Sequence, residues 1–270
     1  MNRTIITFLT LAILSCKTKE TTEIIVIGTL HQPEANFNSE ILFKILEEVK
    51  PDFILLELDS NKFTADFRLK EAKENELLAS KKYQEHYPDT QLRPYEFEDR
   101  NQYRIDKGMR PTDGLTLRLV DSLYQVGLLT TAETEIFKTY KETLEPLKIL
   151  AAKSPENFNN PTTDSLCERR QYYQYEMIPK ITNVRDEFDS RFLIKPNGEK
   201  ISYRDGYQLW ADFWDLRNQT MAKNIMAISE QSEGKKIVVL CGFMHRYYIL
   251  SELKQLTQGT DITLNEYYEL

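Results

Sequence analysis

A strand–helix–strand pattern near the N-terminus constrains the fold more than any other feature of this sequence. Residues 23–30 (EIIVIGTL) and 52–59 (DFILLELD) are short, nearly continuous apolar runs, which are typical of strands covered on both faces. Between them, Asn38 and Ser39 can cap a helix whose apolar residues recur at helical spacing as far as Val49, and Pro51 ends it. This βαβ unit predicts parallel strands with a right-handed crossover.

A second buried-strand pattern lies near the C-terminus. Residues 236–241 (KIVVLC) form an apolar run, and a helix near 246–257 and a strand near 261–267 are expected after it. The segments between the two ends are long, charged and helical, at about 62–82, 115–128, 131–151, 165–190 and 208–231. We therefore expect an α/β domain over 23–270. Both chain ends would build its mostly parallel central sheet, and a large helical insertion would occupy about 60–205.

The first residues predict export and lipid attachment. Arg3 precedes an apolar run over residues 5–14, which is too short to cross a bilayer, and residues 13–16 (ILSC) resemble the lipobox of bacterial lipoproteins. We expect residues 1–15 to be a signal peptide, Cys16 to carry lipid and residues 16–22 to form a tether. The expected location is the bacterial cell envelope, periplasmic or outer membrane. A plain signal peptide with an incidental cysteine is the alternative.

The charge balance limits the partners of the protein. With 35 Lys and Arg against 42 Asp and Glu, the formal net charge is −7. A protein that binds nucleic acid through its phosphates needs the opposite excess, so we expect no nucleic-acid partner. Acidity gives no electrostatic attraction to anionic lipid either. The expected membrane contact is therefore the lipid on Cys16.

Two Gly-x-x-His motifs mark the candidate site. The chain has only three histidines and nine glycines, yet GTLH at 28–31 and GFMH at 242–245 each follow a buried strand. In open α/β sheets, ligands bind at the carboxyl ends of the strands. Glu57 comes from the same edge of the second strand, and a carboxylate in so apolar a run requires a partner. We therefore expect His31, Glu57 and His245 to converge on one centre.

The helix over 208–231 brings further polar residues to this centre. Its apolar stripe, which includes Trp214 and Met221, is interrupted by Arg217 and Asn218. A helix that packs antiparallel on the following strand has its first half beside the carboxyl end of that strand. This arrangement predicts that Arg217 and Asn218 lie near His245.

Taken together, these motifs resemble the TraB/PrgY/GumN family, which includes the TIKI metalloproteases and is similar in fold to erythromycin esterase and ChaN-type proteins. The resemblance is carried by GTLH at 28–31, the glutamate of LLELD at 55–59, the Arg-Asn helix and GFMH at 242–245. It implies His31, Glu57 and His245 as central residues and Arg217 as a supporting one. Arg100, in EFEDRN, matches a further arginine-bearing motif of the family. Asn218 is the expected cofactor contact.

Two chemistries suit this residue set. His31, Glu57 and His245 can ligate a divalent metal such as Mn, Co or Zn, whose bound water then becomes a nucleophile. Alternatively, one histidine activates water without metal while Glu57 orients it and Arg217 or Arg100 stabilises the oxyanion.

Both chemistries predict a lipid-anchored hydrolase, metallopeptidase-like or esterase-like, acting on a small molecule or a peptide. One alternative is a non-catalytic lipoprotein that carries heme or metal in the same pocket. Another is a family member that serves only as an interaction module.

Overall fold

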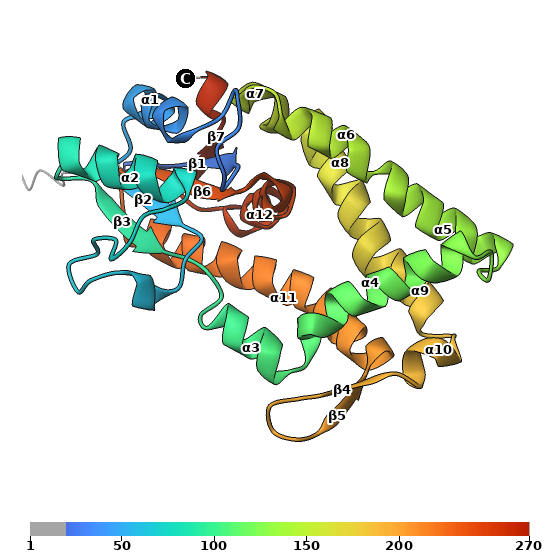
Figure 1. Cartoon of the computed structure of the whole chain (residues 1–270). Helices are drawn as coiled ribbons and strands as arrows, with labels where there is room; N and C mark the ends of the chain where they lie inside the picture. Colours follow the sequence, from blue (N-terminus) through green and yellow to red (C-terminus); the bar gives the residue numbers. More distant parts are fainter. Residues whose placement is uncertain (1–19, 270) are drawn as a thin grey trace, which may run out of the picture.

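A five-stranded parallel sheet forms the core of this computed structural model, which describes residues 20–269 (Figure 1). The signal peptide, Cys16 and most of the tether lie outside the described residues. The strand order is β3-β2-β6-β1-β7, so β6 from the C-terminal part lies between the two strands of the N-terminal βαβ unit. The strands are β1 (Thr22–Thr29), β2 (Phe53–Leu56), β3 (Gln91–Pro94), β6 (Lys236–Gly242) and β7 (Ile262–Asn265). An α/β fold with a parallel sheet is confirmed, and four of its strands come from the two chain ends as predicted. Strand β3 comes instead from the segment 60–205, which was expected to be a helical insertion.

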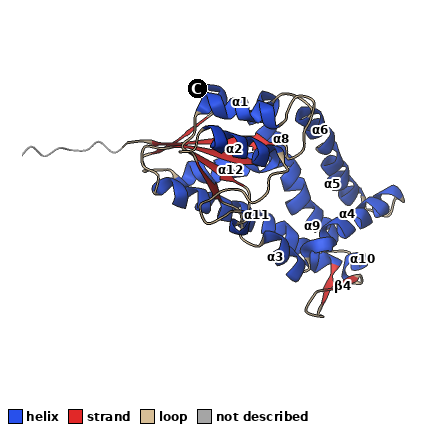
Figure 2. Cartoon of the chain, turned by 60° about the vertical axis from the view of Figure 1, so that its left-hand side comes forward, coloured by secondary structure: helices blue, strands red, loops and turns tan. Residues whose placement is uncertain are grey.

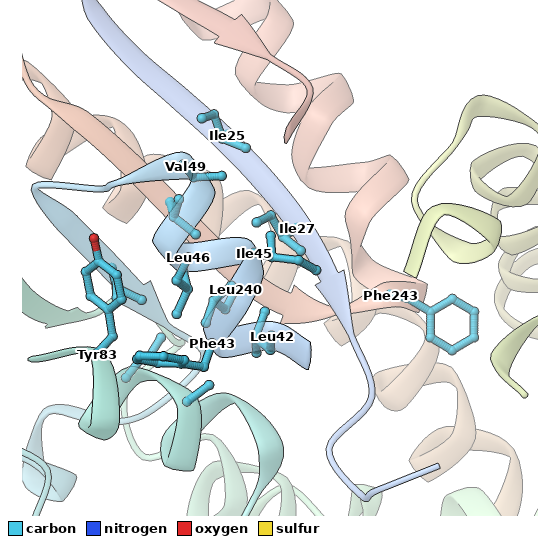
Figure 3. Close-up of a cluster of buried hydrophobic side chains, with 14 of the residues drawn as sticks. Ile25, Ile27, Leu42, Phe43, Ile45, Leu46, Val49, Tyr83, Leu240 and Phe243 are labelled. Carbon is cyan, nitrogen blue, oxygen red and sulfur yellow. The ribbon is translucent and has the colours of Figure 1, made fainter. Parts of the chain in front are cut away.

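Helices cover both faces of the sheet. On one face, α1 (Ser39–Val49) and α2 (Asn75–His86) pack on Ile25, Ile27 and Leu240, as Figure 3 shows for α1. On the other face, α11 (Tyr203–Glu230) and α12 (Phe243–Leu256) pack on the alternate strand residues. This burial on both faces explains why the strand segments are continuous apolar runs. As predicted, the Asn38 side chain caps α1.

The inserted part is helical and has its own hydrophobic cluster, in which Val120, Phe137, Ile178 and Tyr207 are buried. Figure 2 shows its helices extending from beside the parallel sheet to the far end of the molecule, where the short strand β4 also lies. They are α3 (Arg100–Asp106), α4 (Met109–Gln125), α5 (Thr131–Glu142), α6 (Leu144–Ala151), α7 (Pro155–Phe158), α8 (Pro161–Tyr172), α9 (Ile178–Thr182) and α10 (Asp186–Asp189). A π-helical turn (Tyr173–Met177) joins α8 to α9, and β4 (Phe192–Ile194) pairs with β5 (Lys200–Ser202).

Helix α11 connects the two parts of the molecule. Its 28 residues extend over about 42 Å. The first half joins the helical cluster through Tyr207, and the second half packs on the sheet through Met221 and Ile225 (Figure 1). Arg217 and Asn218 lie at the transition between these halves.

Some predicted elements are wrong in extent. Residues 62–74 are not helical beyond a single 3-10 turn (Ser60–Lys62), because Phe63 pairs with Leu69 in an isolated bridge and the Thr64 side chain bonds within the loop. The segment 165–190 is not one helix but is divided by the π-helical turn and by a break before Asp186. Strand β3 and helices α3 and α7 were not predicted.

The outer edge of β1 is completed by side chains. Strand β7 pairs with β1 only as far as Ile25. Beyond it, Arg246 Nε donates to the Val26 carbonyl (3.2 Å), while Asn159 Oδ1 accepts from the Gly28 N–H (2.6 Å) and Asn159 Nδ2 donates to the Gly28 carbonyl (2.9 Å). Asn159 thereby attaches the helical part to the strand that leads to His31.

Two further properties concern the surroundings of the protein. Cys167 and Cys241 are both free and buried. Among the helices of residues 20–269, none combines the length and the apolarity that a membrane span needs.

Candidate functional site

The two Gly-x-x-His motifs meet at the carboxyl edge of the sheet. A Cβ atom at Gly242 would lie 3.5 Å from His31 Nε2, 3.7 Å from Glu57 Oε2 and 3.8 Å from His245 Cδ2. The three central residues expected from the sequence therefore surround one small space, which the absence of a side chain at Gly242 leaves open. The other glycine has a packing role, because a Cβ atom at Gly28 would lie 2.9 Å from Phe243 Cα.

Arg217 is the central cation of this site. Its Nη2 donates to both Glu57 and Glu96, its Nε donates to Glu96 Oε1 (2.9 Å), and its Nη1 lies 2.8 Å from His245 Nε2. Burial alone would lower the pKa of Arg217, but the two carboxylates outweigh this effect and raise it. The guanidinium thus stays charged and all its bonds are to protein groups.

Glu57 and Glu96 carry the matching negative charges. Glu57 Oε2 also accepts from the Gly242 N–H (2.9 Å), and Arg100 Nη1 lies 2.9 Å from Glu96 Oε2 and 3.6 Å from Glu57 Oε1. Burial would raise the pKa of Glu57, but the charge of Arg217 overcomes it and lowers this pKa well below its ordinary value. Two carboxylates and two guanidiniums therefore form one balanced, mostly buried network.

His245 is fixed in one neutral tautomer. Because Arg217 can only donate, His245 Nε2 must accept, so its Nδ1–H donates to Asn218 Oδ1 (2.7 Å). Trp214 stacks on the imidazole with ring centroids 4.4 Å apart. Burial and the adjacent Arg217 charge lower the pKa of His245 to about 3. This ring therefore has no free nitrogen and does not gain a proton near neutral pH.

Asn218 positions His245. Its Oδ1 accepts from the imidazole, its Nδ2 donates to the Trp214 carbonyl (2.7 Å), and the residue is fully buried. The amide has no group directed to a ligand, so the expected cofactor contact at Asn218 finds no support in this arrangement. The predicted position of Arg217 and Asn218 beside His245 is what the structure shows.

His31 differs from His245 in having a free nitrogen. Its Nδ1 lies 2.8 Å from Glu76 Oε1, which also accepts from Thr29 Oγ1, while Nε2 faces the space beside Gly242. Its side chain is 50% exposed, whereas that of Glu76 is 7% exposed. The hydrogen bond that His31 donates to Glu76 is the main cause that raises the pKa of His31 to about 9. A carboxylate that orients one imidazole nitrogen leaves the other to exchange protons with a ligand.

The expected metal ligands do not all fit a cation in this arrangement. His31 and Glu57 face the same space, but both nitrogens of His245 are engaged and the neighbouring Arg217 repels a cation.

A different group within the described residues has a spacing that suits a metal ion. Ligand atoms of His31, Glu74 and Glu76 lie within 4.8 Å of one another, and Glu76 Oε2 is buried without a hydrogen-bond partner there. Imidazole and carboxylate ligands of this kind suit Zn or Mn.

Sequence reasoning missed two site residues, Glu76 and Glu96. Glu76 lies in the first turn of α2, a position hidden by the wrong start expected for that helix. Glu96 follows β3, which has too few apolar residues to be predicted as a strand. The sequence signal available for Glu96 is its place in the segment PYEFEDR, two residues after Pro94.

Comparison with known proteins adds no identification. No protein-family model, curated protein or solved structure matches the chain. Membership of the TraB/PrgY/GumN family therefore stays a prediction from the sequence motifs.

Proposed function

We propose that this protein is a hydrolase of the TraB/GumN type that cleaves ester bonds with His31 as its general base and without a catalytic metal. One observation carries the proposal: His31 Nε2 and Glu57 Oε2 face the same space beside Gly242. The orienting Glu76 and the cationic Arg100 complete the set of groups that acyl transfer to water requires.

The proposed reaction assigns each group a step. In this reaction a water lies between His31 Nε2 and Glu57, and Glu57 accepts a hydrogen bond from it without taking its proton. Neutral His31 removes the other proton as the water oxygen attacks the ester carbonyl carbon, and the carbonyl oxygen becomes an oxyanion. The C–O bond then breaks and His31 returns its proton to the departing alcohol oxygen, giving acid and alcohol.

Arg100 is the better placed guanidinium for this oxyanion. Four of the five N–H groups of Arg217 bond to Glu57, Glu96 and His245, whereas the Nε–H of Arg100 has no hydrogen-bond partner among residues 20–269. Arg217 keeps Glu57 ionised and His245 neutral. Its role is to position the groups around it.

Activity in a chelator tests the proposal. We expect the full chain, purified in detergent and treated with EDTA, to hydrolyse at least one class within a panel of aryl esters, lactones and peptides. Elemental mass spectrometry should show no retained metal. Activity that appears only with Mn, Co or Zn, at one ion per chain, would instead support metal-assisted hydrolysis by the His31, Glu74 and Glu76 group. No turnover under either condition would overturn the hydrolase proposal.

The heme-carrier alternative has less support from the site geometry. The cavity lined by Trp214 and Arg217 has a volume of about 120 Å³, whereas sites that enclose a drug-sized ligand have roughly 300–1,000 Å³. The cavity lined by Leu58 and Glu74 is larger, at about 370 Å³, but no histidine of residues 20–269 lines it. His245 also has no free nitrogen for iron. A strong Soret change on titration with heme would favour this alternative over the hydrolase.

We also propose that the protein is anchored in the bacterial cell envelope by lipid on Cys16. The export pattern of residues 1–16 supports this location. Replacing Cys16 with serine should move the protein from the membrane fraction to the soluble fraction, because serine cannot carry the acyl chains that are the proposed anchor. Cys167→Ser is the matched control and should stay with the membrane. Equal membrane retention of both variants would contradict lipid attachment at Cys16.

A further inference from the structure

A small aromatic cavity adjoins the proposed catalytic site. Tyr175, Trp210, Phe213 and Trp214 line it, and its volume is about 120 Å³. Tyr175 stacks on Trp214 with centroids 4.9 Å apart, and Trp214 stacks in turn on His245. The cavity and the catalytic site therefore share a wall. Tyr175 also belongs to the π-helical turn Tyr173–Met177, a rare feature that is frequent at functional sites.

Arginines line the same cavity. Arg100 and Arg104 come from α3, and Arg217 comes from α11. Arg104 Nη2 donates to Asp113 (2.8 Å) and Arg100 Nη1 pairs with Glu96, but the Nε–H of each is buried and has no hydrogen-bond partner in the described part of the chain. The side chains of Arg100 and Arg104 are nevertheless 27% and 17% exposed, so part of each remains accessible at the cavity that they line. An anionic oxygen in the cavity can pair with such a guanidinium.

The charges of the lining favour a monoanion. Arg100, Arg104 and Arg217 line the cavity, and no carboxylate of the described residues does, but Glu57, Glu96 and Asp113 pair with these guanidiniums and bring their formal charge to zero. A ligand with one negative charge therefore suits the cavity better than a dianionic phosphate. A carboxylate carries one charge and matches the planar guanidinium. A cavity of about 150 Å³ holds benzene, so a volume of about 120 Å³ limits the bound part of a ligand to a single ring, and the rest of the ligand would lie outside the cavity.

We propose that this cavity binds a carboxylate-bearing aromatic ring of the substrate. The carboxylate would contact Arg104, and the ring would lie among Trp210, Phe213 and Trp214, which leaves Arg100 for the oxyanion. The assignment of this ring to a substrate rests on the proposed hydrolase function. The preferred substrate is then an ester of a hydroxylated or acylated aryl carboxylate, with its ester carbonyl carbon at the space beside Gly242.

Tryptophan fluorescence reports on this cavity directly, because the only two tryptophans of the sequence, Trp210 and Trp214, both line it. We expect benzoate to change the emission saturably and benzamide, which lacks the charge, to bind at least about tenfold more weakly. The double variant Arg104→Gln/Asp113→Asn, which removes a cation without leaving Asp113 unpaired, should weaken benzoate binding about tenfold. Arg68→Gln, at an exposed arginine elsewhere, should bind benzoate like the unmodified protein.

The two probes decide the proposal even if the double variant fails to fold. Equal affinity for benzoate and benzamide, or no change in emission with either, would overturn the assignment of a carboxylate site.

Hydrolysis of 3-acetoxybenzoate and 3-acetoxybenzamide separates this inference from the proposed function. A lower KM for the charged ester supports both. Turnover of the two esters with equal KM refutes the carboxylate site and leaves the hydrolase intact. Benzoate binding without turnover of either ester refutes the hydrolase and leaves the binding site intact.

Discussion

Replacing Arg217 with methionine is expected to lower the free energy of unfolding by about 3–5 kcal/mol, the usual cost of removing one partner from a buried ionic network. Methionine fills much of the same volume but leaves Glu57 and part of Glu96 as buried carboxylates without their main cation. It also removes the donor to His245 Nε2. Urea unfolding followed by circular dichroism measures this loss.

An exposed arginine provides the matched control for this experiment. Arg68 pairs with Asp66, and both side chains are more than half exposed. Arg68→Met should therefore cost less than about 1 kcal/mol. If the two variants lose similar stability, the site network does not have the structural role assigned to Arg217.

Replacing His31 with alanine is expected to reduce kcat/KM for an ester substrate by about 10²–10⁴-fold, the usual contribution of a general base. The fold should persist, because the imidazole is half exposed and Glu76 keeps its bond from Thr29. Steady-state rates and a thermal melt together measure both effects. His86→Ala is the control, since His86 is exposed at the end of α2 and should not affect turnover. Full activity of His31→Ala would exclude His31 as the base.

The pH profile distinguishes a base from a merely structural histidine. Only neutral His31 can accept a proton, so kcat/KM should rise with pH through the raised pKa of about 9. Glu76→Gln removes the main cause of that shift. The rising limb should then move down toward about 6.5, the ordinary value for histidine. An unchanged limb in Glu76→Gln would mean that another group titrates.

The sheet could be predicted from sequence because its central strands are buried on both faces. Residues 23–30 and 236–241 are almost wholly apolar for that reason, and few other structures explain such runs. Strand β3 could not be recognised, since QLRP has one fully buried residue, Leu92, and carries an arginine and a proline. The loop at 62–74 depends on contacts such as Phe63 with Leu69, which helical periodicity does not reveal.

The site was predictable in position but not in its hydrogen bonding. The predicted ends of the strands and the predicted direction of the helix over 208–231 bring Glu57, Arg217 and His245 together from the sequence alone, and the structure shows them in contact. The assignment of His245 as a metal ligand depended on its ring nitrogens being free, and whether they are free depends on Arg217 and Asn218 in three dimensions. Glu76 could not be found for a related reason, because its contact with His31 joins two separate segments of the chain.

The side chains that complete β1 also bear on self-association. An exposed strand edge offers unpaired N–H and C=O groups to any other chain, and natural proteins block such edges. At Val26 and Gly28, Arg246 and Asn159 occupy the backbone groups that a foreign strand would need. The helical insertion, which supplies Asn159, thus protects the protein from edge-to-edge aggregation at the strand that leads into its candidate site.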